Sequence, residues 1–183
     1  MRGGLRAGLA SAAALLLVVA CSNEPSPQAS PPTAMAQDQG FVLVMAVPTD
    51  HVADGQAIDV RTTLTWTGPA PKATIWGSGM GPVGFLYEEL TGRKRTMGGV
   101  MTADCAQHLY GRGVVNAIPI GKNVGWSEDD PDAAFFREFA RDPLLHLPAG
   151  RWRITAALDG LLGPCDANPP AINLKAVLEI EVG

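Results

Sequence analysis

The sequence predicts an antiparallel β-sandwich with one short helix. Apolar and polar residues alternate with a period of two wherever a pattern is clear, which is typical of half-buried strands. The 183 residues include 21 glycines and 15 prolines, which separate short segments as turns do. The chain lacks the regular alternation of strands and helices that a parallel sheet requires, which favours an antiparallel architecture. A closed antiparallel barrel is the alternative to the sandwich.

Four segments carry the clearest strand patterns. In the last of them, Leu174, Ala176 and Leu178 begin an apolar face that continues to Val182, while lysine and glutamate occupy the other face. The segment at 41–47 is apolar on both faces, as expected of a fully buried strand. Turns are predicted at Thr91-Gly92 and Asp159-Gly160. The four strongest strand segments are 41–47, 58–66, 151–158 and 174–182, and weaker ones lie near 72–76, 83–90, 93–101 and 112–120.

One segment has a helical pattern instead. Asp130 is expected to cap a helix whose first turn contains Pro131 and Asp132. Aromatic residues then recur at helical spacing over 133–141. Asp142-Pro143 is expected to end the helix.

The residues after this helix suggest a more specific fold. Leu147-Pro148-Ala149-Gly150 is followed, one residue later, by Trp152. This pattern resembles the connection into the penultimate strand of immunoglobulin-like sandwiches, in which a leucine, a turn glycine and an aromatic residue enter the strand. Trp152 stands where tyrosine is usual. The resemblance implies an immunoglobulin-like sandwich.

Residues 1–20 are typical of an export signal, with arginines near the start followed by a short apolar run. The run ends in Val18-Val19-Ala20-Cys21, which resembles the lipobox of bacterial lipoproteins. The resemblance implies cleavage between Ala20 and Cys21 and attachment of lipid, including fatty acyl chains such as palmitate, to Cys21. Ordinary signal cleavage without lipid, or a retained membrane anchor, are the alternatives. The apolar run is short for a span of about 20 residues.

The next segment has the composition of a spacer. Residues 22–40 include four prolines, three serines and no aromatic residue. Such a segment buries too little surface to offset its ordering entropy. We therefore expect a signal peptide at 1–20, a lipidated cysteine and disordered tether at 21–40, and the folded domain at 41–183.

The cysteine count agrees with export. If Cys21 carries lipid, Cys105 and Cys165 remain as a pair in an oxidising compartment. We expect a disulfide between them, with two buried free thiols as the alternative. In the chain-entropy model a bridge across about sixty residues stabilises the fold by on the order of 4 kcal/mol.

Metal binding and catalysis have weaker signals. Cys105-x-x-His108 has soft ligands of the kind that bind copper. A cysteine in a disulfide cannot ligate, and the chain's three histidines lack metal-ligand spacing. Three methionines could join a copper site: Met80, Met97 and Met101.

The glycines from Gly79 to Gly84 match a phosphate-binding pattern, but Pro82 interrupts it, so an inter-strand loop is expected. Ser78 and Ser127 lack the glycine neighbours of a nucleophile elbow. A catalytic triad assembled in space is the remaining route to a hydrolase. We therefore expect no enzyme activity and no cofactor.

The candidate binding surface is Trp126 with the carboxylates Glu128, Asp129 and Asp130. Burying Trp126 would desolvate carboxylates whose only nearby cation is Lys122, so we expect it to be exposed. A solvated helix start explains the carboxylates more simply than a calcium loop does. The net charge of −4 makes nucleic acid an unsuitable partner.

Together these features predict a lipid-anchored protein outside the cytoplasm with a non-catalytic binding or scaffolding role at the cell envelope. Its partners would be the membrane, through the anchor, and an envelope protein or ligand of unknown identity. An exported copper carrier is the alternative, and an envelope hydrolase is less favoured.

Overall fold

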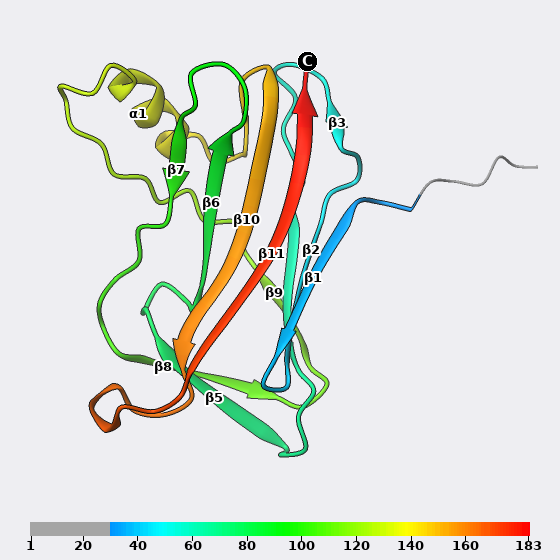
Figure 1. Ribbon diagram of the computed structural model, residues 1–183, viewed down its shortest axis with the longest axis vertical. Coiled ribbons are helices and arrows are strands. Elements are labelled where there is room, and N and C mark those ends of the chain that lie inside the picture. Colours follow the sequence, from blue (N-terminus) through cyan, green and yellow to red (C-terminus); the bar gives the residue numbers. More distant parts are fainter. Residues whose placement is uncertain (1–29) are drawn as a thin grey trace, which may run out of the picture. The chain divides into compact units, whose positions relative to one another are not determined.

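Two β-sheets pack face to face and enclose one apolar core (Figure 1). The computed structural model describes residues 30–183, so the predicted signal peptide and Cys21 lie outside the described residues. The expected all-β sandwich with one short helix is confirmed. No helix within residues 30–183 has the length and apolar character needed to cross a membrane.

The smaller sheet has four antiparallel strands in the order β1-β2-β4-β9. The larger sheet has seven strands, and its main path runs β3-β11-β10-β5-β8, with β6 paired to both β10 and β7. The smaller sheet comprises β1 (Thr33–Asp38), β2 (Phe41–Ala46), β4 (Arg61–Trp66) and β9 (Val115–Ile118). The larger comprises β3 (His51–Val52), β5 (Lys72–Gly77), β6 (Val83–Glu89), β7 (Thr96–Gly98), β8 (Ala106–Gly111), β10 (Gly150–Leu161) and β11 (Ala171–Val182).

The core follows from the alternation in the sequence. Strand β10 directs Trp152, Ile154 and Leu158 inward, and all three are almost fully buried. From the opposite sheet, Phe41 and Leu43 of β2 belong to the same core cluster. At about 25 cal/mol per Å² of apolar surface, this shared core is the main stabilising contribution to the fold.

The predicted tether ends earlier than expected. Residues 33–38 form β1, which pairs with β2 from Thr33↔Ala46 to Asp38↔Phe41, so the prediction of a disordered tether through residue 40 is wrong for this part. A tight turn with positive φ at Gln39 and Gly40 joins the two strands. The stabilisation comes from backbone pairing to a buried strand, which the polar composition of the segment does not reveal.

The predicted turn at Asp159-Gly160 is also wrong, because both residues lie inside β10. The ladder between β10 and β11 continues through Gly160↔Ile172 to Leu161↔Ala171. A Cβ on Gly160 would lie 2.5 Å from the Ile75 side chain, so the glycine serves close packing rather than a turn. The turn at Gly92, where φ is +71°, is confirmed.

The helix α1 (Ala133–Arg141) is confirmed, with Phe136 and Phe139 buried against the core. Its N-cap is Asp132 rather than the predicted Asp130. Asp130 acts one step earlier, because its carboxylate accepts a hydrogen bond of 2.8 Å from the Asp132 N–H.

Candidate functional site

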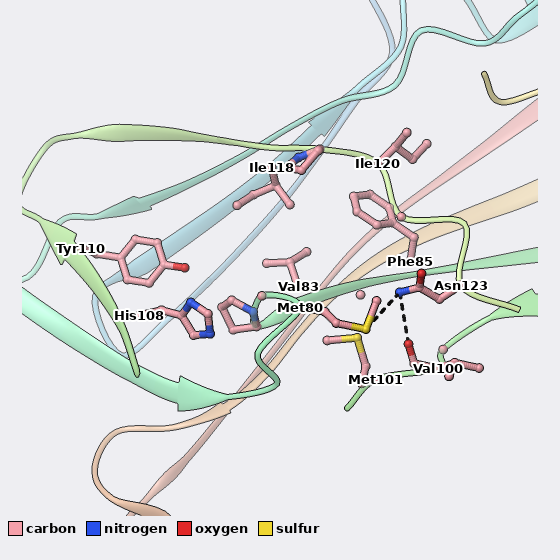
Figure 2. A pocket seen from close by; sticks show the side chains of 16 residues that line it. Met80, Val83, Phe85, Val100, Met101, His108, Tyr110, Ile118, Ile120 and Asn123 are labelled. Carbon is pink, nitrogen blue, oxygen red and sulfur yellow. Dashed lines mark hydrogen bonds between the residues drawn. The ribbon is translucent and has the colours of Figure 1, made fainter. Parts of the chain in front are cut away.

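A cavity of about 320 Å³ lies where strands β6, β8 and β9 approach one another (Figure 2). Its lining is mainly apolar and includes the loop after β5 and residues 99–101. The apolar lining side chains are Met80, Pro82, Val83, Phe85, Val100, Met101, Ile118, Pro119 and Ile120.

The strand pattern places these walls. On β6, Val83 and Phe85 are two residues apart and share the buried face. Between them, Gly84 leaves room on the other face for the Met101 side chain, since a Cβ there would lie 3.0 Å from the Met101 Sδ. Methionine fills irregular space well, which suits a rim that closes against several elements.

Three polar side chains reach the cavity. The hydroxyl of Tyr110 points toward it (Figure 2), and within residues 30–183 the only buried side-chain polar atom without a partner is Thr62 Oγ1. Burial raises the pKa of Tyr110 to about 12, so the group is a neutral donor at physiological pH. At the other end, Asn123 donates to the Val100 carbonyl at 3.3 Å, which leaves its own side-chain oxygen free to accept. His108 is the third.

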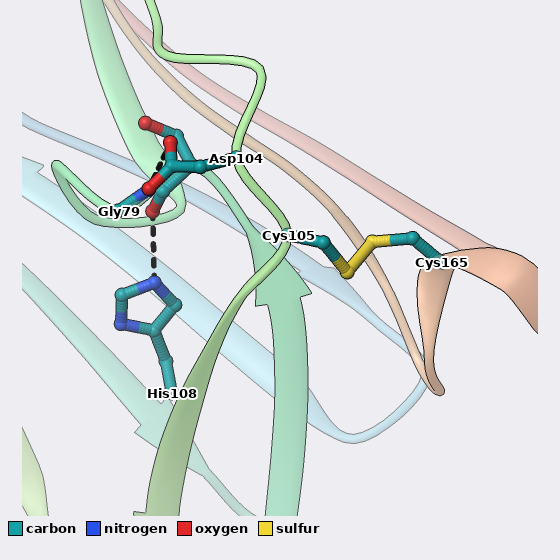
Figure 3. Close-up of a disulfide and its surroundings, with 6 residues drawn as sticks. Gly79, Asp104, Cys105, His108 and Cys165 are labelled. Atoms are coloured by element: carbon teal, nitrogen blue, oxygen red, sulfur yellow. Dashed lines mark hydrogen bonds between the residues drawn. A yellow bond between two sulfur atoms is a disulfide. The ribbon is translucent and has the colours of Figure 1, made fainter.

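His108 belongs to a cluster that the sequence did not reveal. Its Nε2 lies 2.9 Å from the main-chain oxygen of Ser78 (Figure 3). The buried Ser78 hydroxyl lies 2.8 Å from the Thr102 hydroxyl and accepts the backbone N–H of Met80. General-base activation of a nucleophile requires a hydrogen bond between the base and the hydroxyl. Here the imidazole bonds to the main-chain oxygen of Ser78 instead of its hydroxyl. These contacts tie the loop after β5 to residues 102–105.

Asp104 completes this tie. Its carboxylate accepts the Gly79 N–H at 3.0 Å. Hydrogen bonds from the Thr102 side chain and from Gly79 hold the pKa of Asp104 below its usual range. Serine, histidine and aspartate thus come together here, but their contacts fix the rim of the cavity.

A disulfide joins Cys105 to Cys165, with their Cα atoms 6.2 Å apart (Figure 3). It follows directly on the Thr102–Asp104 contacts and fixes the end of the segment that forms one rim of the cavity. Both cysteines lie on the surface.

The predicted copper ligands are not all brought together. Cys105 is in the disulfide and Met97 is buried in the core. The other three, Met80, Met101 and His108, do line one cavity, although Figure 2 shows the imidazole at the end opposite the two sulfur atoms. Within residues 30–183 no three His, Cys, Asp or Glu side chains are grouped to hold a metal.

The predicted surface around Trp126 differs from expectation. Trp126 is half-buried and packs against the core, so the prediction of an exposed side chain is wrong. The carboxylates nearby find cations distant in sequence: Glu128 pairs with Arg137, and Asp132 lies 3.2 Å from Arg93. Because Glu128 and Asp132 are paired in this way, neither opposes the partial burial of the indole.

Asp129 is exposed, and Asp130 is used at the start of the helix. Lys122, the expected partner of these carboxylates, turns instead to the end of α1. Its Nζ donates to the carbonyls of Asp142 and Leu144, at 2.8 and 2.5 Å. The structure therefore does not bring these predicted residues into one polar site.

The cavity has the composition of a small-ligand site, with apolar walls and few polar groups. It sits at the low end of the usual range of about 300–1,000 Å³ for such sites. No protein-family model, curated protein or solved structure matches the chain.

Proposed function

We propose that the chain is a non-catalytic binding protein held by lipid at Cys21 outside the cytoplasm, and that its ligand occupies the cavity between β6, β8 and β9. The observation that carries the proposal is the convergence of Tyr110, His108 and Asn123 on an otherwise apolar cavity. Apolar walls supply affinity, and a few polar groups fix orientation.

The chemistry of the lining indicates a neutral, mainly apolar ligand. Histidine is the only ionisable side chain other than the neutral Tyr110 among the residues that line the cavity. A charged group placed there would lose its hydration without gaining a fixed counter-charge. A ligand oxygen could accept a hydrogen bond from the Tyr110 hydroxyl, which lines the cavity.

The location rests on independent observations. The Val18-Val19-Ala20-Cys21 sequence resembles a lipobox, and the disulfide between Cys105 and Cys165 suits an oxidising compartment. The folded unit begins at Pro31, so residues 22–30 separate the proposed lipid site from the sandwich. A spacer of this kind would hold the cavity away from the bilayer.

A neutral apolar fluorophore, N-phenyl-1-naphthylamine, tests the binding function. Titration into the purified protein is expected to give saturable fluorescence. Ile118→Lys, which puts a charge in the cavity wall, is expected to weaken binding by about tenfold or more, equivalent to roughly 1.4 kcal/mol. The control is Val177→Lys on β11, where the valine is 43% exposed and does not line the cavity.

Both variants are first checked for an unchanged melting temperature. Unsaturable fluorescence, or equal binding by the two folded variants, would reject the cavity as the site.

A further inference from the structure

We infer that the ligand is an uncharged peptide segment in extended conformation, which adds as a strand to the free edge of β8 and inserts one apolar side chain into the cavity. This inference rests on the proposed function and names its ligand class.

Strand β8 ends the larger sheet. It pairs with β5 from Lys72↔Gly111 to Gly77↔Ala106, and within residues 30–183 no other strand pairs with it. Alternate residues of an edge strand direct backbone N–H and C=O groups away from the sheet, where an added strand can bond to them. Strand β9 ends the smaller sheet in the same way.

The cavity is lined by both of these edge strands. His108 and Tyr110 come from β8, and Ile118 comes from β9 (Figure 2). The residue between His108 and Tyr110 is Leu109, which faces the other side of the strand and is 60% exposed. A peptide strand beside β8 would alternate in register, with one side chain toward the cavity and the next beside Leu109.

The size of the cavity is compatible with one inserted side chain of a longer ligand. A volume of about 320 Å³ accommodates a large apolar side chain but leaves the rest of a longer ligand outside. Outside the cavity, β8 offers unpaired backbone groups and Leu109, and β9 offers Val115, which is 65% exposed. Strand addition uses both features: backbone bonds give affinity and the pocket gives specificity.

The charges identify the kind of peptide. From 106 to 121 the only ionisable side chains other than tyrosine are His108 and Arg112. Natural edge strands are usually protected from pairing by lysine, proline or inward-pointing charges. Neither β8 nor β9 contains any lysine, proline or carboxylate. An uncharged segment matches β8 and β9 themselves, because neither strand carries a fixed charge and Arg112 lies beyond the end of β8.

The remaining strand edges are poorer candidates. Strand β3 has two residues and β7 has three, too few to template an added strand. Strand β1 has six residues but contributes none to the cavity.

Fluorescence anisotropy with a labelled acetylated and amidated Thr-Val-Thr-Leu-Thr-Val-Thr peptide tests the inference. Saturable binding is expected, with loss of tenfold or more when aspartate replaces the central leucine. Two further peptides carry N-methyl groups on alternate amides, one on each set. Strand addition predicts that one set abolishes binding and the other preserves it, because only one edge of the peptide faces β8. Equal binding by both N-methylated peptides would refute strand addition.

Leu109→Lys supplies the protein-side test. It is expected to weaken peptide binding by tenfold or more without changing the melting temperature, because the side chain is exposed. Val177→Lys places the same charge on an exposed valine of β11 and is expected to bind like the wild type.

Three outcomes separate this inference from the proposed function. If the naphthylamine probe binds and the peptide does not, the peptide inference is wrong and the cavity function stands. If neither binds, the proposed function fails as well. If the protein dimerises in sedimentation analysis and Leu109→Lys abolishes the dimer, the occupant of the edge is a second copy of the chain, which overturns the peptide inference.

Discussion

The indole N–H of Trp152 donates a hydrogen bond of 2.8 Å to the main-chain carbonyl of Pro148. Trp152 is fully buried, so this bond closes the chain back on itself at the entry to β10. The bond joins the side chain to backbone four residues upstream and so fixes the direction in which the chain enters the strand.

Trp152→Phe is therefore expected to destabilise the fold by about 2–4 kcal/mol, measured as a change in the urea unfolding midpoint. The variant removes the donor, leaves the Pro148 carbonyl without its partner, and creates a cavity. The control is Trp76→Phe, a half-buried tryptophan on β5, which is expected to lose less than about 1 kcal/mol. Equal losses in the two variants would contradict a special role for the Trp152 bond.

A buried ion pair between Glu89 and Arg95 connects β6 to the segment before β7. The Arg95 Nε lies 2.7 Å from the Glu89 Oε2, and the guanidinium covers the Phe135 ring at 4.1 Å. The hydrogen bond from Arg95 lowers the pKa of Glu89 below its ordinary value of 4.5. Removal of Arg95 would leave an uncompensated buried carboxylate, so Arg95→Met is expected to cost about 3–5 kcal/mol at pH 7.

The same pair predicts an acid limb of stability. Because the folded pKa of Glu89 is depressed, its contribution is complete above the unfolded pKa and is lost as pH falls through the folded pKa. Glu89→Gln should therefore flatten the fall in unfolding free energy below about pH 4.5. Asp59→Asn, at an exposed pair with Arg61, is the control for loss of one carboxylate and should change the unfolding free energy at pH 7 by less than about 1 kcal/mol. An identical acid limb in wild type and Glu89→Gln would contradict this assignment.

The disulfide is expected to stabilise the fold and its cavity together. In the chain-entropy model a closed loop with a sequence separation of 60 stabilises by on the order of 4 kcal/mol. The double variant Cys105→Ser, Cys165→Ser should melt well below the oxidised wild type and should not respond to reductant. Because the bridge fixes one rim of the cavity, the double variant should also bind the naphthylamine probe more weakly. A reductant-sensitive melting temperature in the double variant would show that another thiol is responsible.

Periodicity predicts most of the sandwich, because strands such as β10 and β11 alternate over many residues with one face buried. It did not predict β8, whose six residues mix buried Tyr110 with exposed Leu109 and partly buried His108. Strand β1 was missed for a related reason, since its only large apolar side chain, Met35, is 67% exposed. Both strands exist because their backbones pair with β5 and β2, an interaction that leaves little trace in composition.

The cavity could not be predicted from the sequence either, because it depends on how strands and loops distant in sequence come together. Its polar groups Tyr110 and Asn123 lie on an unpredicted strand and an irregular segment, and neither belongs to a motif. The Ser78, Asp104 and His108 cluster likewise assembles across 30 residues through loop contacts. The cysteine pair was predictable, because parity in an oxidising compartment leaves few partners.

The proposed lipid anchor predicts a single modified thiol. Cys21 lies outside the described residues, and the remaining cysteines are bonded to each other. Metabolic labelling with an alkyne fatty acid should mark the wild type and not Cys21→Ser. The Cys105→Ser, Cys165→Ser variant should still be labelled. Equal labelling of wild type and Cys21→Ser would refute the anchor.

The half-buried position of Trp126 makes a quantitative prediction that separates two views of its segment. An exposed tryptophan would cost less than about 0.5 kcal/mol when replaced by alanine, and one in the core roughly 3–5 kcal/mol. The indole contacts the core cluster yet is only partly covered, so Trp126→Ala is expected to cost about 2 kcal/mol.

The matched control is Phe136→Ala in α1, at a side chain only 7% exposed, for which about 3–5 kcal/mol is expected. A loss below about 0.5 kcal/mol for Trp126→Ala would show that the side chain is exposed and could contact a ligand. A loss equal to that of Phe136→Ala would place it fully in the core. The intermediate value follows from the partial coverage of the indole, which packs against the core on one side only.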